Sequence, residues 1–181
     1  MGNLKNRILK KLDKLLLVQN FKIVTKRDKT KLEEKDVMSI PVKIFGEDIE
    51  YLLYKFDINH KKHLFPYFNQ STEGATAMCD YILFCTNNNS SNNELLHVIL
   101  IELKKTRDDE KAKQQLNAGE CFSNFIISTL NRINGLNISI KIKKVIVLKP
   151  TKAETGFQNL EEVNGYYRHD KENFTIDQFI S

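Results

Sequence analysis

The sequence contains no tryptophan, only three prolines and only seven glycines among its 181 residues. Seven glycines leave little scope for a phosphate-cradling loop, and neither a GxxxxGK[ST] nor a GxSxG motif occurs. Chemistry driven by ATP would therefore need another chain. Cysteine is also scarce, and Cys79, Cys85 and Cys121 form no close pair of the kind found in disulfide frameworks or zinc knuckles. This usage fits a reducing compartment, and we expect a cytoplasmic protein.

Long hydrophobic runs are missing as well. A membrane-spanning helix needs roughly 20 predominantly apolar residues, whereas the apolar runs here are short and interrupted by Lys, Asn or Glu. Residues 1–17 space their apolar side chains between lysines at helical intervals, unlike the single apolar block of a signal peptide. Asn6 stands where a myristoylation signal has Ser or Thr. We expect no association with a membrane.

The charge balance is moderately basic, with 28 Lys and Arg against 23 Asp and Glu, a net charge of +5 and a pI near 9.0. This excess permits a polyanionic partner without requiring one. The abundance of Lys and Asn and the absence of Trp are also typical of a genome rich in A and T. Both interpretations stay open.

Hydrophobic periodicity predicts alternating helices and strands. Leu4, Ile8, Leu12, Leu15 and Leu16 recur at helical spacing opposite a series of lysines. The expected elements are a helix over 3–19, strands over 21–25, 36–45, 49–56, 77–85 and 94–105, a helix over 107–131 and a strand over 138–150. The central strands are apolar on both faces, which indicates an α/β fold covered on both sides.

Turn and breaker residues place the connections between these elements. Pro41 is expected to confine its strand to a sheet edge or a bulge. The Asn-rich loop 86–93 joins two strands into a hairpin, and Asn134-Gly135 ends the second helix. Residues 57–70 are basic, aromatic and expected to be irregular. Asn164-Gly165 predicts a turn in a tail whose place in the fold the pattern does not give.

The length suits one domain rather than two. We expect a single domain over 1–181, with an N-terminal helix and strands in 1–70, a core in 73–149 and a C-terminal elaboration in 150–181. No internal repeat is visible in the sequence.

The segment HVILIELKKT, residues 97–106, ends a buried strand with charged side chains. Glu102 and Lys104 point to the same face of this strand because side chains alternate. Asp80 begins the other strand of the hairpin, so its carboxylate and that of Glu102 can meet at one end of the sheet. Two buried carboxylates repel each other, and a divalent cation is the simplest compensation.

Magnesium is the ion that this set of ligands suits. Mg²⁺ prefers one or two carboxylates together with carbonyl and water oxygens, and the main chain of Leu103 can offer the carbonyl. Lys104 would reach the water beside the metal, where an ammonium group can orient or deprotonate the nucleophile or stabilise charge on a phosphate.

This pattern of an Asp, a spacer and Glu-x-Lys resembles the PD-(D/E)XK nuclease superfamily, over roughly residues 73–149. The resemblance implies a restriction-endonuclease-like core, a central mixed β-sheet flanked by helices in the order αβββαβ. It implies that Asp80 and Glu102 bind Mg²⁺, with Mn²⁺ expected to substitute, and that Lys104 serves the attacking water. Cys79 departs from the motif, since it stands in the position of its Pro.

Two further residues enter the predicted catalytic set. Gln115 falls about 40° from the centre of the inner face of its helix at 100° per residue, and an amide turned inward needs a partner. Several branches of the superfamily carry a Gln on this helix near the active site, although Gly119 stands where one such branch has Tyr. The resemblance also suggests Glu73 as an additional acidic residue from an upstream segment.

The function implied is a Mg²⁺-dependent nuclease in a bacterial or phage defence setting. We expect DNA rather than RNA as its substrate, and endonuclease rather than exonuclease action. Candidate nucleic-acid contacts are Lys61, Lys62, Lys105 and Arg107. A chain without a separate recognition domain is expected to act as a homodimer, or as a subunit recruited by a recognition or ATPase partner.

Competing interpretations remain open at this point. The fold can have lost catalysis and serve as a module that binds nucleic acid or a protein partner. Asp80 and Lys104 can form an ion pair that closes the sheet end, with Glu102 solvated. The His60-x-x-His63 spacing does not suit a zinc site with the available cysteines, and Cys121 has no evident His partner for thiol chemistry.

Overall fold

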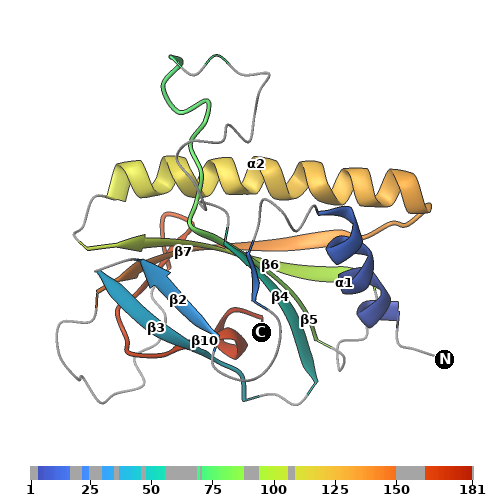
Figure 1. The fold of residues 1–181 in the computed structure, drawn as a ribbon, viewed down its shortest axis with the longest axis horizontal. Coiled ribbons are helices and arrows are strands. Elements are labelled where there is room, and N and C mark those ends of the chain that lie inside the picture. Colours follow the sequence, from blue (N-terminus) through green and yellow to red (C-terminus); the bar gives the residue numbers. More distant parts are fainter. Residues whose placement is uncertain are drawn as a thin grey trace.

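The computed structural model describes residues 4–16, 22–24, 30–34, 37–45, 48–55, 69, 71–87, 94–105, 109–149 and 162–180. Within these residues the chain forms two β-sheets and two α-helices (Figure 1). The larger sheet has the strand order β1-β4-β5-β6-β7-β9-β8. Its strands are β1 (Lys22–Val24), β4 (Ile49–Lys55), β5 (Tyr81–Asn87), β6 (Leu95–Lys104), β7 (Ser139–Leu148), β8 (Glu162–Val163) and β9 (Tyr166–His169).

The expected hairpin and the helix that follows it form the centre of the molecule. β5 pairs antiparallel with β6, α2 (Asp109–Asn134) follows, and β7 returns parallel to β6. The helix ends at Asn134, and Gly135 adopts a φ of 60° that favours glycine. β5 begins at Tyr81 rather than Ala77, because residues 77–79 have no regular structure and Asp80 forms a bend directly before the strand.

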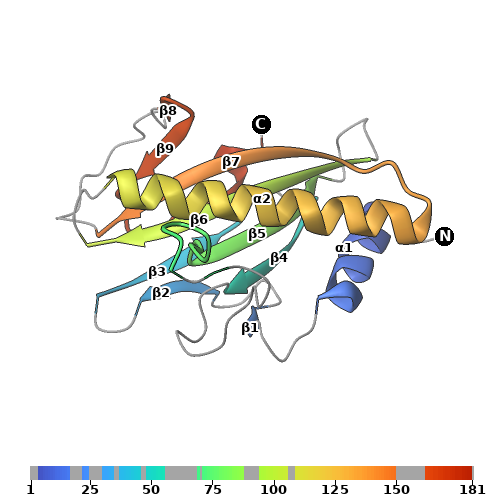
Figure 2. The ribbon, with the colours of Figure 1, turned by 90° about the horizontal axis from the view of Figure 1, so that it is seen from above.

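Both helices lie on one face of the large sheet (Figure 2). α1 (Leu4–Leu15) buries Ile8, Leu9 and Leu12 in the same apolar cluster that receives Ala112 and Leu116 from α2. The sheet is thus flanked by helices and covered on both sides, as expected, but within the described residues both helices lie on the same face. The mixed α/β sheet is present, but the second layer is not helical.

A second sheet covers the opposite face, in the strand order β10-β3-β2. Its strands are β2 (Lys31–Glu34), β3 (Met38–Lys43) and β10 (Phe174–Thr175). Leu32, Ile40 and Phe174 pack there against Ile99 and Ile101 of β6, and the 3-10 helix η2 (Ile176–Phe179) completes the layer. β6 is buried on both faces, as its apolar run predicted, because α2 covers one face and this sheet the other.

Pro41 lies in β3, the middle strand of the small sheet, and not at an edge as expected. The main-chain nitrogen of Val42 donates to the oxygen of Thr30, which directs it toward β2. The nitrogen of Pro41 therefore faces β10, whose pairing with β3 begins only at Val42. The missing N–H of proline costs no ladder hydrogen bond there.

The C-terminal tail contributes strands to both sheets. Asn164 and Gly165 form the expected turn, with φ values of 53° and 81°, and join β8 to β9. β9 adds to β7 in parallel, whereas β10 pairs with β3. The large sheet thus combines strands from residues before 70, from 73–149 and from beyond 150.

Some expectations fall outside the described residues, including the irregular segment at 57–68 and the start of the second helix at 107–108. Among the helices that are described, none has the length and apolar character needed to cross a membrane.

Candidate functional site

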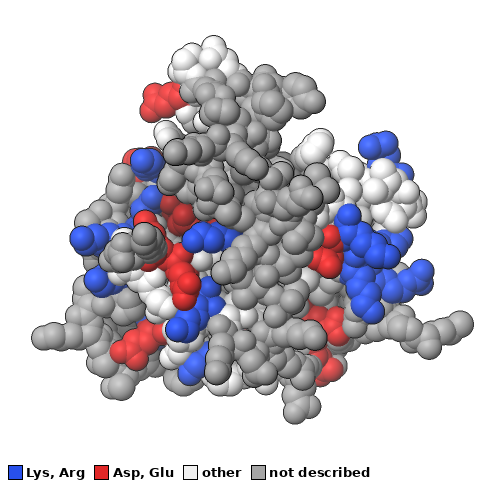
Figure 3. All heavy atoms as spheres, viewed as in Figure 1, with Lys and Arg blue, Asp and Glu red and all other residues white. Residues whose placement is uncertain are grey.

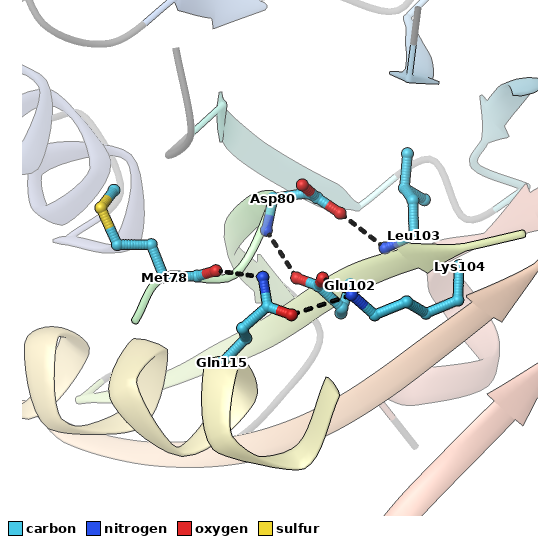
Figure 4. Close-up of polar contacts among 6 residues, drawn as sticks. All are labelled: Met78, Asp80, Glu102, Leu103, Lys104 and Gln115. Carbon is cyan, nitrogen blue, oxygen red and sulfur yellow. Dashed lines mark hydrogen bonds and ion pairs between the residues drawn. The ribbon is translucent and has the colours of Figure 1, made fainter. Parts of the chain in front are cut away.

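The predicted site lies at the start of β5, where β6 continues beyond its last residue paired with β5. The last paired residues are Tyr81 and Ile101, so Leu103 has no strand partner on this side. Asp80, at the bend before β5, takes that place, and the Leu103 N–H donates to Asp80 Oδ2 at 2.7 Å (Figure 4). The Asp80 carboxylate therefore caps the free main chain of β6.

Glu102 is the buried centre of the cluster, with 1% of its surface exposed. It points to the face that carries α2, as does Leu100, which packs against α2. Its Oε2 accepts from the Asp80 N–H at 3.1 Å, and its Oε1 accepts from Lys104 Nζ at 2.6 Å. The Lys104 side chain, from the same strand, and the Asp80 main chain, from the bend before β5, thus hold the Glu102 carboxylate in place.

Lys104 and Gln115 connect this strand to the first turns of α2 (Figure 4). Lys104 Nζ, whose side chain is 17% exposed, also donates to Gln115 Oε1 at 2.8 Å. Gln115 Nε2 donates to the Met78 carbonyl at 2.9 Å. The half-buried Gln115 therefore has its amide orientation set at both ends, and it orients the lysine ammonium in turn.

A close approach of α2 to the segment before Asp80 makes this contact possible. A Cβ atom at Gly119 would lie 2.6 Å from Cys79 Sγ, so only glycine allows the helix to pack this near. Gly119 lies one helical turn beyond Gln115, on the same side of α2. The packing of Gly119 on Cys79 thus brings Gln115 within reach of Met78 and Lys104.

The electrostatics of the cluster centre on Glu102. Burial, and next the neighbouring Asp80 carboxylate, raise the pKa of Glu102 from 4.5 to about 8, against the opposing effect of Lys104. The same two carboxylates add to the effect of burial in raising the pKa of the Cys79 thiol. The site therefore holds more negative charge than its single ammonium compensates.

The raised pKa predicts how stability depends on pH in the absence of metal. Above pH 4.5 the unfolded chain has released the Glu102 proton that the folded chain keeps until about pH 8. The free energy of unfolding therefore falls as pH rises through this window, by at most about 5 kcal/mol. Glu102→Gln should remove most of this fall.

Denaturant unfolding in EDTA between about pH 7 and 8 tests this expectation, because unfolded histidines have largely lost their protons there and unfolded cysteines still keep theirs. The buried His169, whose pKa is lowered to about 4, then adds no further change. A Glu102→Gln variant with the same pH slope as the wild type would show that another group causes the fall.

The other predicted site residues divide into three groups. Glu73 is exposed in the turn 71–76 and, within the described chain, hydrogen-bonds to none of Asp80, Glu102 and Lys104. Lys105 is exposed directly beside Lys104. Arg107, Lys61 and Lys62 lie outside the described residues.

The alternative ion pair between Asp80 and Lys104 is not the one that forms. Lys104 pairs with Glu102 at 2.6 Å, and Glu102 is buried rather than solvated. The reason is geometric. Glu102 and Lys104 are two residues apart on one face of β6, whereas the Asp80 carboxylate turns toward the main chain of Leu103.

The donor set fits a magnesium ion by its chemistry. The Lys104 oxygen accepts from the Lys149 N–H, so the main-chain groups of Lys104 face β7. Those of Leu103 face the opposite edge, where Asp80 lies, which places a carbonyl oxygen beside two carboxylates. No group of three or more His, Cys, Asp or Glu side chains suited to a metal occurs in the described residues. Mg²⁺ does not need one, because it keeps several waters.

Sequence reasoning missed the main-chain members of the cluster. The Asp80 N–H and the Met78 carbonyl hold Glu102 and Gln115, and neither group has a signature in residue type. The available signal was Asp80 itself, a polar residue directly before an apolar strand. Gln115 was identified, since its helical phase points inward.

We compared the chain with models of protein families, with curated proteins and with solved structures, and found no match in any of the three.

Proposed function

We propose that the chain is a Mg²⁺-dependent phosphodiesterase that hydrolyses nucleic acid, with DNA as the expected substrate and Mn²⁺ as a substitute metal. The observation that carries the proposal is the position of Lys104 Nζ, between Glu102 Oε1 at 2.6 Å and Gln115 Oε1 at 2.8 Å, beside a second carboxylate. A fixed ammonium next to two carboxylates is suited to reaction at a phosphate.

Asp80, Glu102 and the Leu103 carbonyl are the groups that would hold the metal. The repulsion between the two carboxylates supports this assignment, because the Asp80 carboxylate helps to raise the Glu102 pKa. A divalent cation bound between them would relieve the repulsion and lower that pKa. Bound Mg²⁺ would supply Lewis acidity toward the phosphate.

The remaining work falls to side chains of the chain itself. Lys104 would place its ammonium against the phosphate oxygen that gains charge, or against the attacking water. Gln115 would keep the ammonium oriented, because its own amide is held by the Met78 carbonyl. Burial of Glu102 strengthens each of these electrostatic interactions relative to water.

Other parts of the proposal follow from the sequence. The core order α1, β4, β5, β6, α2, β7 is compatible with the αβββαβ order of a restriction-endonuclease-like core. We propose a cytoplasmic setting, which the free Cys79, Cys85 and Cys121 support, and action as a homodimer or as a subunit of a defence complex.

A structural clamp is the competing function for the same residues. Glu102 has Lys104 as an internal partner, and the Asp80 carboxylate accepts from Leu103, so the cluster satisfies itself. Such a clamp would join β5, β6 and α2 in a catalytically inactive module that binds nucleic acid or a protein.

Incubation of the purified chain with circular DNA, linear DNA and single-stranded RNA separates the two functions. Each polymer is tested with Mg²⁺, with Mn²⁺ and with EDTA. The proposal expects cleavage of DNA with either metal and none in EDTA. Binding without cleavage in every metal condition would identify the inactive module instead.

A further inference from the structure

α1 presents a basic face at its solvent-exposed side. Arg7, Lys10, Lys11 and Lys14 follow the helical spacing i, i+3, i+4, i+7, which places all four on one arc of about 100°. Arg7, Lys10 and Lys14 are exposed and Lys11 is half-buried. Figure 3 shows Lys and Arg side chains gathered over this helix, at the right of the view. We call these four residues the α1 basic face.

These four cations have no internal partner in the part of the chain that the structure describes. Lysines elsewhere differ, since Lys113 pairs with Glu110 at 2.7 Å and Lys144 with Glu120 at 2.6 Å. The acidic residue of α1, Asp13, is turned toward the sheet, where its Oδ1 is buried and its charge helps to raise the pKa of Tyr54. Among the described residues, nothing neutralises the positive charge of the α1 basic face, which is therefore available to an external partner.

The burial of α1 selects among polyanionic partners. A helix that lies in a membrane surface inserts its apolar face between lipids. In α1 this face is occupied, because Ile8, Leu9 and Leu12 are at most 5% exposed against the sheet. The available contact is purely electrostatic and presented on a rigid helix, which suits the phosphates of a nucleic-acid backbone.

We propose that the α1 basic face is an anchor for the phosphate backbone of a nucleic-acid duplex, remote from the candidate active site. The choice of polyanion rests on the proposed function. Gln115 belongs to the first turns of α2, whereas α1 lies near the last turns (Figures 1 and 2). α2 has 26 residues, so it is about 39 Å long at 1.5 Å per residue.

Because of this separation, the contribution of the anchor to binding depends on the length of the duplex. A duplex rises about 3.4 Å per base pair, so roughly 6–9 base pairs lie between the site and the anchor. A long duplex reaches both, whereas a small phosphodiester reaches only the site. The anchor therefore contributes to the binding of polymer and not to the chemical step.

The salt dependence of duplex binding tests the anchor. Binding of a DNA duplex of about 30 base pairs is measured in EDTA over a series of salt concentrations for the wild type and for Lys10→Gln/Lys14→Gln. Each phosphate contact contributes about 0.9 to the slope of log K against log salt, so the double variant should lower the slope by about 2. Both side chains are exposed, and Gln is a good helix former.

Lys31→Gln/Lys43→Gln is the matched control, because it removes the same charge from exposed positions on the small sheet. The proposal expects this control to keep the wild-type slope. Equal slopes for the α1 variant, the control and the wild type would overturn it. So would binding to vesicles of phosphatidylcholine and phosphatidylserine in equal parts that depends on Lys10 and Lys14 while duplex binding does not.

Hydrolysis of bis(4-nitrophenyl) phosphate distinguishes failure of the anchor from failure of the proposed function. The α1 double variant should retain the wild-type rate on this small diester. Lack of any hydrolysis by the wild type, together with a changed salt slope in the α1 variant, would contradict the nuclease while leaving the anchor in place. Normal hydrolysis with an unchanged slope would contradict the anchor alone.

Discussion

Lys104→Ala is expected to lower the rate of DNA cleavage by on the order of 10²–10⁴, the range typical of a positioned acid-base or electrostatic group. The substitution removes the ammonium that lies 2.6 Å from Glu102 and 2.8 Å from Gln115. Lysine is not a ligand of Mg²⁺, so metal binding should persist. A plasmid-nicking time course gives the rate, and calorimetry gives the metal affinity.

The control for Lys104→Ala must separate chemistry from folding, because the variant leaves the buried Glu102 without its ion-pair partner. Gln115→Ala removes the group that orients the ammonium and keeps the ion pair, so it should lower the rate by a smaller factor. Circular dichroism checks that both variants fold. A folded Lys104→Ala protein that cleaves at the wild-type rate would make this lysine a structural partner only.

Asp80→Asn is expected to lose both Mg²⁺ binding and cleavage. The amide oxygen of Asn can still accept the Leu103 N–H, which Asp80 Oδ2 accepts at 2.7 Å, so the cap on β6 is retained. The change removes the negative charge, and Mg²⁺ binds carboxylates far better than an amide in such a site. Titration calorimetry should show heat of binding for the wild type and none for the variant.

A second readout checks that Asp80→Asn acts through charge. The Asp80 carboxylate is one of the causes that raise the Glu102 pKa, so that pKa should fall in the variant. The decline of metal-free stability between pH 7 and 8 should shrink accordingly. An Asp80→Asn protein that binds Mg²⁺ with wild-type affinity would remove Asp80 from the metal site.

The parts of the fold that the sequence predicted are those with a strong local signal. The unbroken apolar run of β6 and the Asn134-Gly135 helix end each specify structure within a few residues, and β5 and β6 pair antiparallel as the expected hairpin requires. Gln115 could be assigned to the site because helical phase fixes the side of α2 that it occupies.

The parts that were not predicted depend on tertiary contacts. β2 has the sequence KLEE, in which only Leu32 is apolar, and it is a strand because Leu32 fills the core beneath β6. Nothing in the spacing of α1 specifies which face of the sheet it covers, and both helices share one face. The pairing of β9 with β7 joins strands that residues 149–165 separate in the sequence.

The sequence predicted the side chains of the candidate site and, of its main-chain groups, only the Leu103 carbonyl. Glu102 and Lys104 share a face because strands alternate, which needs no tertiary information. Asp80 contacts Glu102 through its own N–H, and this contact depends on the bend at Asp80. Glu73, which was placed by resemblance alone, is exposed in the turn 71–76.

The most direct test of the nuclease assignment is the conversion of supercoiled plasmid to its nicked form by the wild-type chain, followed with Mg²⁺ and then after addition of excess EDTA. Asp80→Asn, purified in the same way, is assayed in parallel. We predict nicking that requires the metal, stops with EDTA and is missing from the variant. Nicking that continues in EDTA, or that is equal in Asp80→Asn, would contradict it, as would an intact plasmid after incubation of the folded wild type with Mg²⁺.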